Sequence, residues 1–405
     1  MSRIVSAELG QIYDSRGRPT VEATLVLDSG IRGRAGAPSG ESTGTHEVLA
    51  FPADGGVTTA LATFRARLAP ALVGRDASDQ AGVDAILHVI DRTPNFSEIG
   101  GNTATAVSVA AAVATAEERG VPLWKLLARP GIEIPASPAI VGNCLNGGRH
   151  AINGPDMQEF HAIAQAPRVE DSIRAALRVH ALVGEELRRR RPTQALGRGD
   201  EGGWVASIGN VEAIEILTGA CAAARDELHV LVHPGLDLAA SEFFTDGRYR
   251  YREQTLDPEG QVRFVAGLVD RFGLTYVEDP FDQEAFDGFA ALTRAVGSRA
   301  LVVGDDLYTS RRARLERGIE LGASNAVLIK VNQVGTLTDA FASVDLARSR
   351  GLATVTSHRS GEVPEAWLAH VALASGAWGL KCGLLGGERV AKLNELLRLG
   401  RATGP

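Results

Sequence analysis

The chain has 405 residues, of which 44% are hydrophobic and 22% are charged. This composition is typical of a globular protein, and the length exceeds one ordinary core, so we expect about two domains. The formal net charge of −7 gives no overall basic character. We therefore expect no nucleic-acid partner.

The cysteines and the apolar segments bear on where the protein works. Cys144, Cys221 and Cys382 lie far apart and show no metal-ligand spacing, which favours a reducing compartment over a disulfide framework. The first residues lack the long apolar core of a secretory signal. Residues 104–116 are apolar, but they are shorter than a membrane span and lead into charged residues, which predicts a buried helix. We expect a cytoplasmic protein with no membrane partner.

The first third of the chain has the pattern of an α+β domain. Residues 3–13 and 20–28 are predicted to be strands, and the turn-forming residues 14–19 join them. A loop rich in glycine and serine follows at 37–44. Helical patterns then dominate from about 57 to 128.

A change of pattern marks a second domain. Three prolines and a glycine interrupt helix formation between residues 129 and 138, so we expect one domain of residues 1–134 and another of residues 135–405. From about residue 139, short apolar runs alternate with helical stretches, which is typical of βα units. The second domain is therefore predicted to be an α/β barrel.

An ionisable residue follows nearly every apolar run of the predicted barrel. Such a side chain is costly to bury alone, whereas the carboxyl ends of barrel strands converge on one active site. Each residue could instead begin a solvated loop, but the ordered series favours a shared polar centre. The seven residues are Glu159, Asp237, Glu278, Asp305, Lys330, His358 and Lys381.

Three of these residues are carboxylates on successive predicted strands. Asp237, Glu278 and Asp305 would repel one another at close range, and a hard divalent cation removes that repulsion. Magnesium binds a few carboxylates and keeps positions open for water and substrate oxygens. The alternative is three separate ion pairs with barrel arginines.

Proton-transfer groups are also present. Lys330 follows an apolar run, where neighbouring cations would lower its pKa and make it a general base, although an ordinary ion pair is an alternative. Glu159 and Glu201 are candidates for the acid. Glu201 lies in a glycine-rich turn at 199–203 that brings a carboxyl near a substrate or is simply a loop.

A cationic loop suggests the chemistry of the ligand. The guanidinium of Arg359 suits a phosphate or a carboxylate, and Ser360 follows it directly. Alternatively, this loop starts a helix and Ser360 is its cap. Lys381 adds a second cation on a neighbouring strand. A ligand that carries both phosphate and carboxylate would explain these cations.

These residues and the motifs around them resemble the enolase family, whose members convert 2-phosphoglycerate to phosphoenolpyruvate. Each matching motif is weak alone, but their order along nearly the whole chain is specific. The motifs are DSRGRPTVE at 14–22, PSGESTG at 38–44, NGGRH at 146–150, MQEF at 157–160, GDEGG at 199–203, AASEF at 239–243, VEDPF at 277–281, GDDL at 304–307, LIKVNQ at 328–333 and SHRSGE at 357–362.

The resemblance implies an N-terminal α+β cap on a modified (β/α)8, or TIM, barrel. It also implies that Lys330 removes the C2 proton, that Glu201 protonates the departing hydroxyl and that Glu159 is its partner. Asp237, Glu278 and Asp305 would bind one magnesium ion, and Ser42 on a closing loop would bind a second that arrives with the substrate. Substrate contacts would come from His150, Gln158, His358, Arg359, Ser360 and Lys381.

The family usually forms dimers. Glu22 and Arg398 match positions that pair between subunits in relatives, so a homodimer is predicted, with a higher oligomer as an alternative. The small phosphorylated carboxylate substrate is the other expected partner.

Some segments depart from the family pattern. The loop after Lys381 has lost hydroxyls and an arginine, and Leu384 with Leu385 is expected to make a wall of the pocket more apolar. Glu41 replaces a small residue in the closing loop. Two interpretations follow: a divergent true enolase, or an enolase-like dehydratase of phosphonate biosynthesis that makes a phosphonate-bearing enolpyruvate of the carboxyphosphonoenolpyruvate type.

Other classes of function fit less well. A role without turnover predicts loss of Lys330, Glu201 or a metal carboxylate, and none is lost. A racemase or cycloisomerase of the wider superfamily would carry a Lys-x-Lys pair where this chain has Gln158 and Glu159. The arginines at 188–191 are predicted to be the solvated end of a helix, because Pro192 stops it.

Overall fold

The N-terminal part of the chain forms a small antiparallel sheet. The structure is a computed structural model that describes residues 2–41, 43–52, 55–129 and 137–403. Strands β1 (Ile4–Tyr13), β2 (Pro19–Leu27) and β3 (Arg32–Gly36) pair in that order. Alternate residues of β2 are buried, as expected for a strand with one face on a core. The two predicted strands are confirmed.

Helices cover one face of this sheet. Helix α4 (Gly101–Arg119) packs against β2 and β3 so closely that a Cβ on Gly33 would lie 2.1 Å from the carbonyl oxygen of Ala110. Residues 104–116 are mostly buried within α4, which confirms the predicted buried helix. The other helical segments here are α1 (Gly56–Thr63), η1 (Phe64–Leu68), α2 (Ala69–Leu72), α3 (Gln80–Ile90) and α5 (Leu123–Leu127).

The second part of the chain is a closed barrel of eight strands. The strands follow one another in the order β16-β15-β14-β13-β12-β8-β5-β4, and β16 pairs with β4 to close the circle. Strand β5 is antiparallel to β4 and β8, so the barrel is a modified one, as predicted. The strands are β4 (Ala139–Asn146), β5 (Glu159–Gln165), β8 (Leu231–Asp237), β12 (Tyr276–Glu278), β13 (Leu301–Gly304), β14 (Ala326–Ile329), β15 (Ala353–Ser357) and β16 (Gly379–Gly383).

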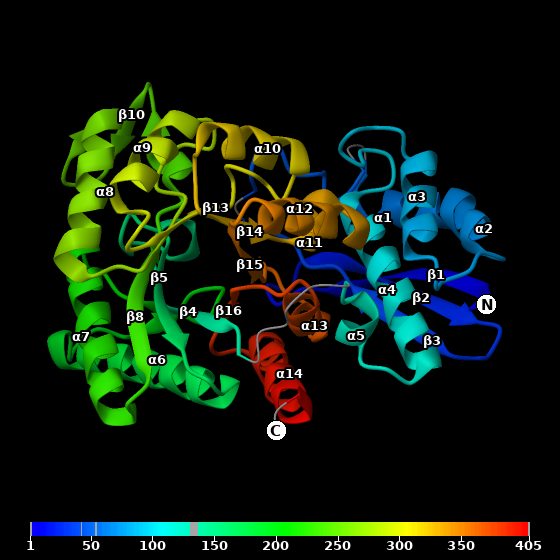
Figure 1. Ribbon diagram of the computed structural model, residues 1–405, viewed down its shortest axis with the longest axis horizontal. Helices are drawn as coiled ribbons and strands as arrows, with labels where there is room; N and C mark the ends of the chain where they lie inside the picture. The colour runs from blue at the N-terminus through cyan, green and yellow to red at the C-terminus, as the bar shows by residue number, and fades with distance from the viewer. Residues whose placement is uncertain (1, 42, 53–54, 130–136, 404–405) are drawn as a thin grey trace.

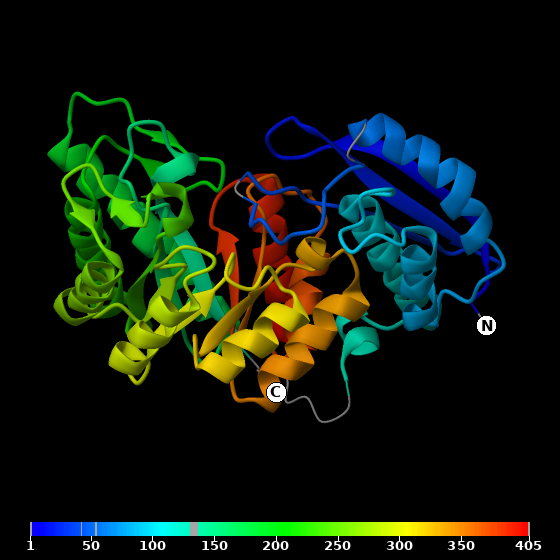
Figure 2. The same ribbon diagram turned by 90° about the horizontal axis from the view of Figure 1, so that it is seen from above.

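Helices surround the barrel, and the N-terminal sheet with its helices lies to one side of it (Figures 1 and 2). The helices are α6 (Val169–Arg190), α7 (Asn210–Leu228), α8 (Pro258–Phe272), α9 (Phe286–Val296), α10 (Arg312–Leu321), α11 (Val331–Val334), α12 (Leu337–Ser349), α13 (Trp367–Ala374) and α14 (Gly387–Thr403). The described residues also form two short 3-10 turns, η2 (Gly148–His150) and η3 (Ala240–Phe243), and five short strands. These strands are β6 (Gly197–Arg198), β7 (Trp204–Val205), β9 (Phe244–Thr245), β10 (Arg248–Arg250) and β11 (Thr255–Leu256).

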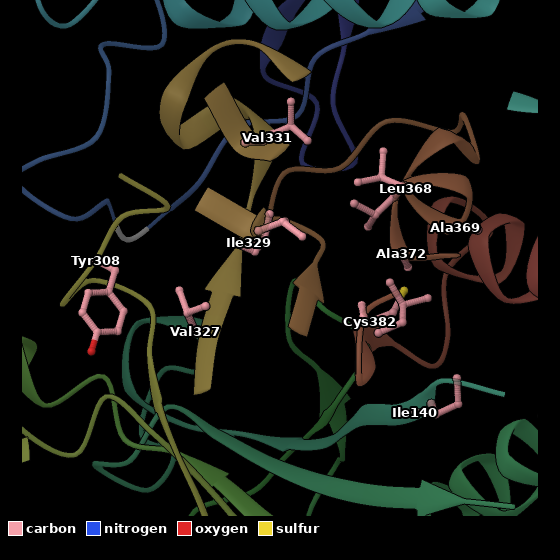
Figure 3. Packing of buried hydrophobic residues seen from close by; sticks show 14 of the residues in the cluster. Ile140, Tyr308, Val327, Ile329, Val331, Leu368, Ala369, Ala372 and Cys382 are labelled. Atoms are coloured by element: carbon pink, nitrogen blue, oxygen red, sulfur yellow. The ribbon is translucent and has the colours of Figure 1, made fainter. Parts of the chain in front are cut away.

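The barrel strands are apolar on both faces, because each face meets a different part of the core. Val327 and Ile329 of β14 belong to the large cluster under the helices, together with Leu368 of α13 (Figure 3). The intervening Ala326 and Leu328 belong to a separate cluster of the barrel. The strands therefore read as continuous apolar runs in the sequence.

Three further expectations concern the end of helix α6, membrane-spanning helices and the domain boundary. Helix α6 ends at Arg190 with surface ion pairs to Glu186, which confirms the predicted solvated helix end. In the described ranges, no helix is long and apolar enough to cross a membrane. The predicted domain boundary after residue 134 lies outside the described residues and stays a prediction.

Candidate active site

The structure brings the predicted site residues to one end of the barrel. Asp237 and Glu278 end β8 and β12, and Asp305, Lys330 and His358 directly follow β13, β14 and β15. Lys381 lies inside β16. One polar cavity is lined by Gly40, His150, Gln158, Glu159, Glu201, Asp237, Asp305, Lys330, Ser357, His358, Arg359, Ser360 and Lys381.

One expectation about this arrangement was wrong. Glu159 does not follow an apolar strand but begins β5. Because β5 runs antiparallel to its neighbours, its first residue lies at the same edge as the ends of the other strands, and Glu159 is paired with Asp237. Glu159 thus reaches the common centre by the reversed direction of its strand.

Lys381 lies among three buried carboxylates. Its Nζ is 2.6 Å from Glu278 Oε1, 2.9 Å from Asp237 Oδ2 and 2.9 Å from Glu159 Oε2. Burial lowers the pKa of Lys381, but these carboxylates together raise it well above its ordinary value. Burial and the charge of Asp237 raise the pKa of Glu278. The protonation states of these groups depend on one another, and the single positive charge of Lys381 compensates only part of the negative charge of the three carboxylates.

Lys330 forms an ion pair with Oδ2 of Asp305. The other carboxylate oxygen of Asp305, Oδ1, accepts a hydrogen bond of 2.9 Å from Gln333 Nε2. Burial lowers the pKa of Lys330, yet the Asp305 carboxylate outweighs it, and the pKa is raised. We expected a lowered pKa. The protein groups alone give the opposite result, because the carboxylate is nearer than the neighbouring cations.

Glu201 also lines the cavity. Its Oε2 is 3.0 Å from His358 Nε2 and accepts a hydrogen bond of 3.2 Å from Asn143, and its Oε1 is 4.0 Å from His150 Nδ1. Burial and Glu159 raise the pKa of Glu201, but the two histidines lower it to about 2. Burial lowers the pKa of His150, whereas the carboxylates of Glu201 and Glu159 raise it to about 9. The expected protonated state of Glu201 is thus not the one that the protein groups alone favour.

A loop of the N-terminal sheet domain reaches Arg359 and Ser360, the two residues that are predicted to contact a phosphate. Arg359 forms two hydrogen bonds with Glu47, of 2.8 and 3.1 Å, and a third of 3.0 Å with Asn332 Oδ1. Ser360 Oγ accepts a hydrogen bond of 2.7 Å from the backbone of Glu41. These contacts join the two domains at the cavity. Ser42, the predicted ligand of a second magnesium, lies outside the described residues.

Comparisons with known proteins agree with this geometry. Residues 4–127 match the family described as the enolase N-terminal domain, and residues 135–404 match the enolase C-terminal TIM barrel domain. The chain belongs to the enolase family. An enolase of Natronomonas pharaonis is 45% identical over 403 residues, which cover 98% of this chain and 99% of the relative. An enolase of Methanothermobacter thermautotrophicus is 44% identical over 404 residues, which cover 98% and 96%.

The loop that departs from the enolase pattern does not line the cavity. Within the described part of the chain, none of residues 382–389 is among the lining residues. Leu384 is fully buried, and a Cβ on Gly142 would lie 2.9 Å from its methyl groups. The expected apolar wall at Leu384 was therefore wrong, because this side chain packs into the core behind the strand.

Several residues of the site were missed by sequence reasoning. Asp279 accepts backbone hydrogen bonds of 2.9 Å from Asp305 and 2.7 Å from Asp306, and so fixes the loop after β13. Burial and Asp305 raise the pKa of Asp306 to about 8. The doubled acidic residues in VEDPF and GDDL were a signal for both. Glu47, His161 and Arg389 carry no such signal, because they contact the site from a distant loop, a strand interior and a helix.

The carboxylates fit the divalent cation that the family uses. Five buried carboxylates lie at the cavity or bond its lysines, and the amino groups of Lys330 and Lys381 face them. This excess of negative charge suits a hard cation with oxygen ligands. Asp305, Asp306 and Asp279 also bring ligand oxygens within 4.8 Å of one another. The five buried carboxylates at the cavity are those of Glu159, Glu201, Asp237, Glu278 and Asp305.

Proposed function

We propose that this chain is a magnesium-dependent hydro-lyase that converts 2-phosphoglycerate to phosphoenolpyruvate and water. Relatives named enolase match it over nearly their full length. The observation that carries the proposal is that a lysine and a glutamate, Lys330 and Glu201, line one cavity together with further carboxylates. An elimination of water needs a base and an acid in this arrangement.

Asp237, Glu278 and Asp305 would hold the first magnesium ion, and Ser42 with the substrate would hold a second. Bound magnesium would stabilise the negative charge that develops on the substrate carboxylate when its neighbouring carbon is deprotonated. Lys381 would add its positive charge to the same group. The ion pairs of Lys381 with Asp237 and Glu278 show that its amino group is within reach of the proposed ligands.

Lys330 would accept the C2 proton through its Nζ. The charge of Asp305 keeps the pKa of Lys330 high. Once Asp305 ligates a cation, its charge is shared and the pKa of Lys330 falls toward the value a base requires. We expect the opposite change at Glu201, whose carboxyl would gain a proton as the anionic substrate enters beside it and then pass it to the leaving hydroxyl, with Glu159 as its partner.

The remaining lining residues would bind the substrate. Arg359 and Ser360 would contact the phosphate, and His150, Gln158 and His358 would lie beside the rest of the molecule. For Arg359 this requires exchange of its contacts, because its guanidinium binds Glu47 in the structure. The chemistry of the partner is thus a small phosphorylated carboxylate.

The phosphonate-pathway alternative gains no support. Of the departures on which it rested, the altered loop after Lys381 does not line the cavity, and Leu384 of this loop packs against Gly142. We also infer a cytoplasmic homodimer. Cys144, Cys221 and Cys382 are unpaired and buried, which suits a reducing compartment. Arg398 is exposed, and in the dimer a glutamate of the partner subunit would replace its bond to Glu395.

The test is the absorbance of the enolpyruvate product after purified protein is mixed with magnesium and 2-phosphoglycerate. We expect robust turnover that is lost in Lys330→Ala. An exposed acid far from the cavity, Asp246, supplies the matched control Asp246→Asn, which should retain turnover. Magnesium bound at the site with no turnover of 2-phosphoglycerate would overturn the proposal.

A further inference from the structure

Helix α14 presents two buried cations to the loop that follows β15. Arg389 and Lys392 are three residues apart, so they lie on one face of the helix, and they are 0% and 1% exposed. Lys392 donates to the carbonyl oxygen of Val363. Arg389 Nη2 donates to the carbonyl oxygens of Ser360 at 2.7 Å and Asp200 at 3.3 Å. Arg389 thus joins the His358 loop to the turn that carries Glu201.

The same arginine contacts the imidazole of His358. Its Nη1 lies 2.6 Å from His358 Nδ1, and the backbone N–H of Gly383 lies 3.3 Å from the same nitrogen. Both groups are donors, and a guanidinium has no acceptor to offer. Nδ1 must therefore be the unprotonated nitrogen, and the ring proton is on Nε2. The nitrogen that carries this proton lies 3.0 Å from Glu201 Oε2.

We propose that Arg389 is a positioning residue that fixes His358 as the neutral Nε2–H tautomer and thereby determines which oxygen of Glu201 carries the acidic proton. The inference rests on the proposed role of Glu201. Oε2 accepts a hydrogen bond of 3.2 Å from Asn143 and lies 3.0 Å from His358 Nε2. Because two N–H groups, of Asn143 and of His358, lie beside Oε2, the proton that Glu201 transfers is held on Oε1.

Two further observations agree with this assignment. Burial lowers the pKa of His358 and the Glu201 carboxylate raises it, but burial and Arg389 outweigh Glu201, so the pKa is lowered and the neutral ring is favoured. A Cβ on Gly383 would lie 2.2 Å from the carbonyl oxygen of Glu201, so the strand that donates to Nδ1 also touches the backbone of the acid. The segment that departs from the family pattern therefore acts on Glu201 from behind, without lining the cavity.

The test is the tautomeric state of His358 in the full-length chain, read from imidazole ¹⁵N–¹H correlation spectra and assigned with His358→Gln. We expect a neutral ring with its proton on Nε2 in the wild type at neutral pH. In Arg389→Met the ring should become charged or gain the other tautomer, and kcat should fall roughly 10- to 100-fold with little change in KM. Arg389→Lys should restore part of both.

Lys392→Met is the matched control, because it removes a buried cation from the same helix face but leaves the contact to His358 intact. It should keep the Nε2–H tautomer. A wild-type His358 protonated on Nδ1 would overturn the inference, even if Arg389→Met did not fold. An unchanged tautomer in a folded Arg389→Met protein would overturn it as well. The spectra need no substrate, so they remain informative if Glu201→Gln shows that the proposed function is wrong.

Discussion

Two sides of the cavity are built in different ways. The base side, which we define as Asp237, Glu278, Asp305, Lys330 and Lys381, comes from consecutive parallel strands or the residues that directly follow them. The acid side, defined as His150, Glu201 and His358, comes from the turn η2, the loop at 199–203 and the residue after β15, and contacts among them and with Arg389 of α14 hold it. The base side is therefore placed by the barrel itself, whereas the acid side depends on contacts between distant segments.

The base side and the acid side also differ in their electrostatics. On the base side, lysines lie between carboxylates of opposite charge, and the pKa of Lys330 is raised. On the acid side, Glu201 lies near two histidines, and its pKa is lowered to about 2. The protein groups thus keep Lys330 protonated and Glu201 deprotonated, whereas the reaction needs a neutral Lys330 and a protonated Glu201 at its start. The entry of cation and substrate is what we expect to reverse both.

The largest effect is expected when the base side loses its proton acceptor. Lys330→Ala should lower kcat by about 10⁴-fold, because general base catalysis contributes up to that factor. It should also stop exchange of the C2 proton with solvent deuterium, measured by NMR. Magnesium affinity, measured by calorimetry, should persist. Exchange at the wild-type rate in this variant would contradict the role of Lys330.

Glu201→Gln separates the two sides. We expect product formation to fall by about 10³-fold, since the leaving hydroxyl loses its proton donor. The base side is untouched, so exchange of the C2 proton should continue. Loss of exchange and product formation in equal measure would mean that Glu201 does not act in a separate step. Asn143→Asp, which alters a neighbour of Glu201 and not the acid itself, should have a smaller effect on product formation.

A third prediction concerns the cation on the base side. Magnesium at about 100 times its Kd should raise the free energy of unfolding by about 2.7 kcal/mol, because the ion binds only the folded chain. Thermal melting with and without magnesium measures this gain. Asp305→Asn should remove most of it, and the exposed Asp246→Asn should keep it. An equal gain in both variants would place the cation elsewhere.

The sequence predicts the base side well because burial and strand period determine it. An apolar run of four residues such as 326–329 is short and lies between helical stretches, which favours a buried strand that Lys330 directly follows. Glu201 could be named as a candidate acid from its glycine-rich turn, but the contacts that hold the loops around the cavity could not be predicted, since they span the chain. Arg359 and Glu47 are 312 residues apart, and Arg389 lies in a helix 31 residues after His358. Glu159 was misplaced because no local pattern reveals that β5 is antiparallel.

The smallest predicted effect tests whether the acid side is held by packing. A Cβ on Gly383 would lie 2.2 Å from the carbonyl oxygen of Glu201, whereas a Cβ on Gly387 would meet nothing within 4 Å. Gly383→Ala should push the turn of Glu201 away and lower kcat by about 10-fold, because small misplacements of a catalytic group are costly. Magnesium affinity and C2 proton exchange should not change, since both belong to the base side. Gly387→Ala should behave as the wild type, and equal kcat values for the two variants would show that packing on Glu201 does not control the acid step.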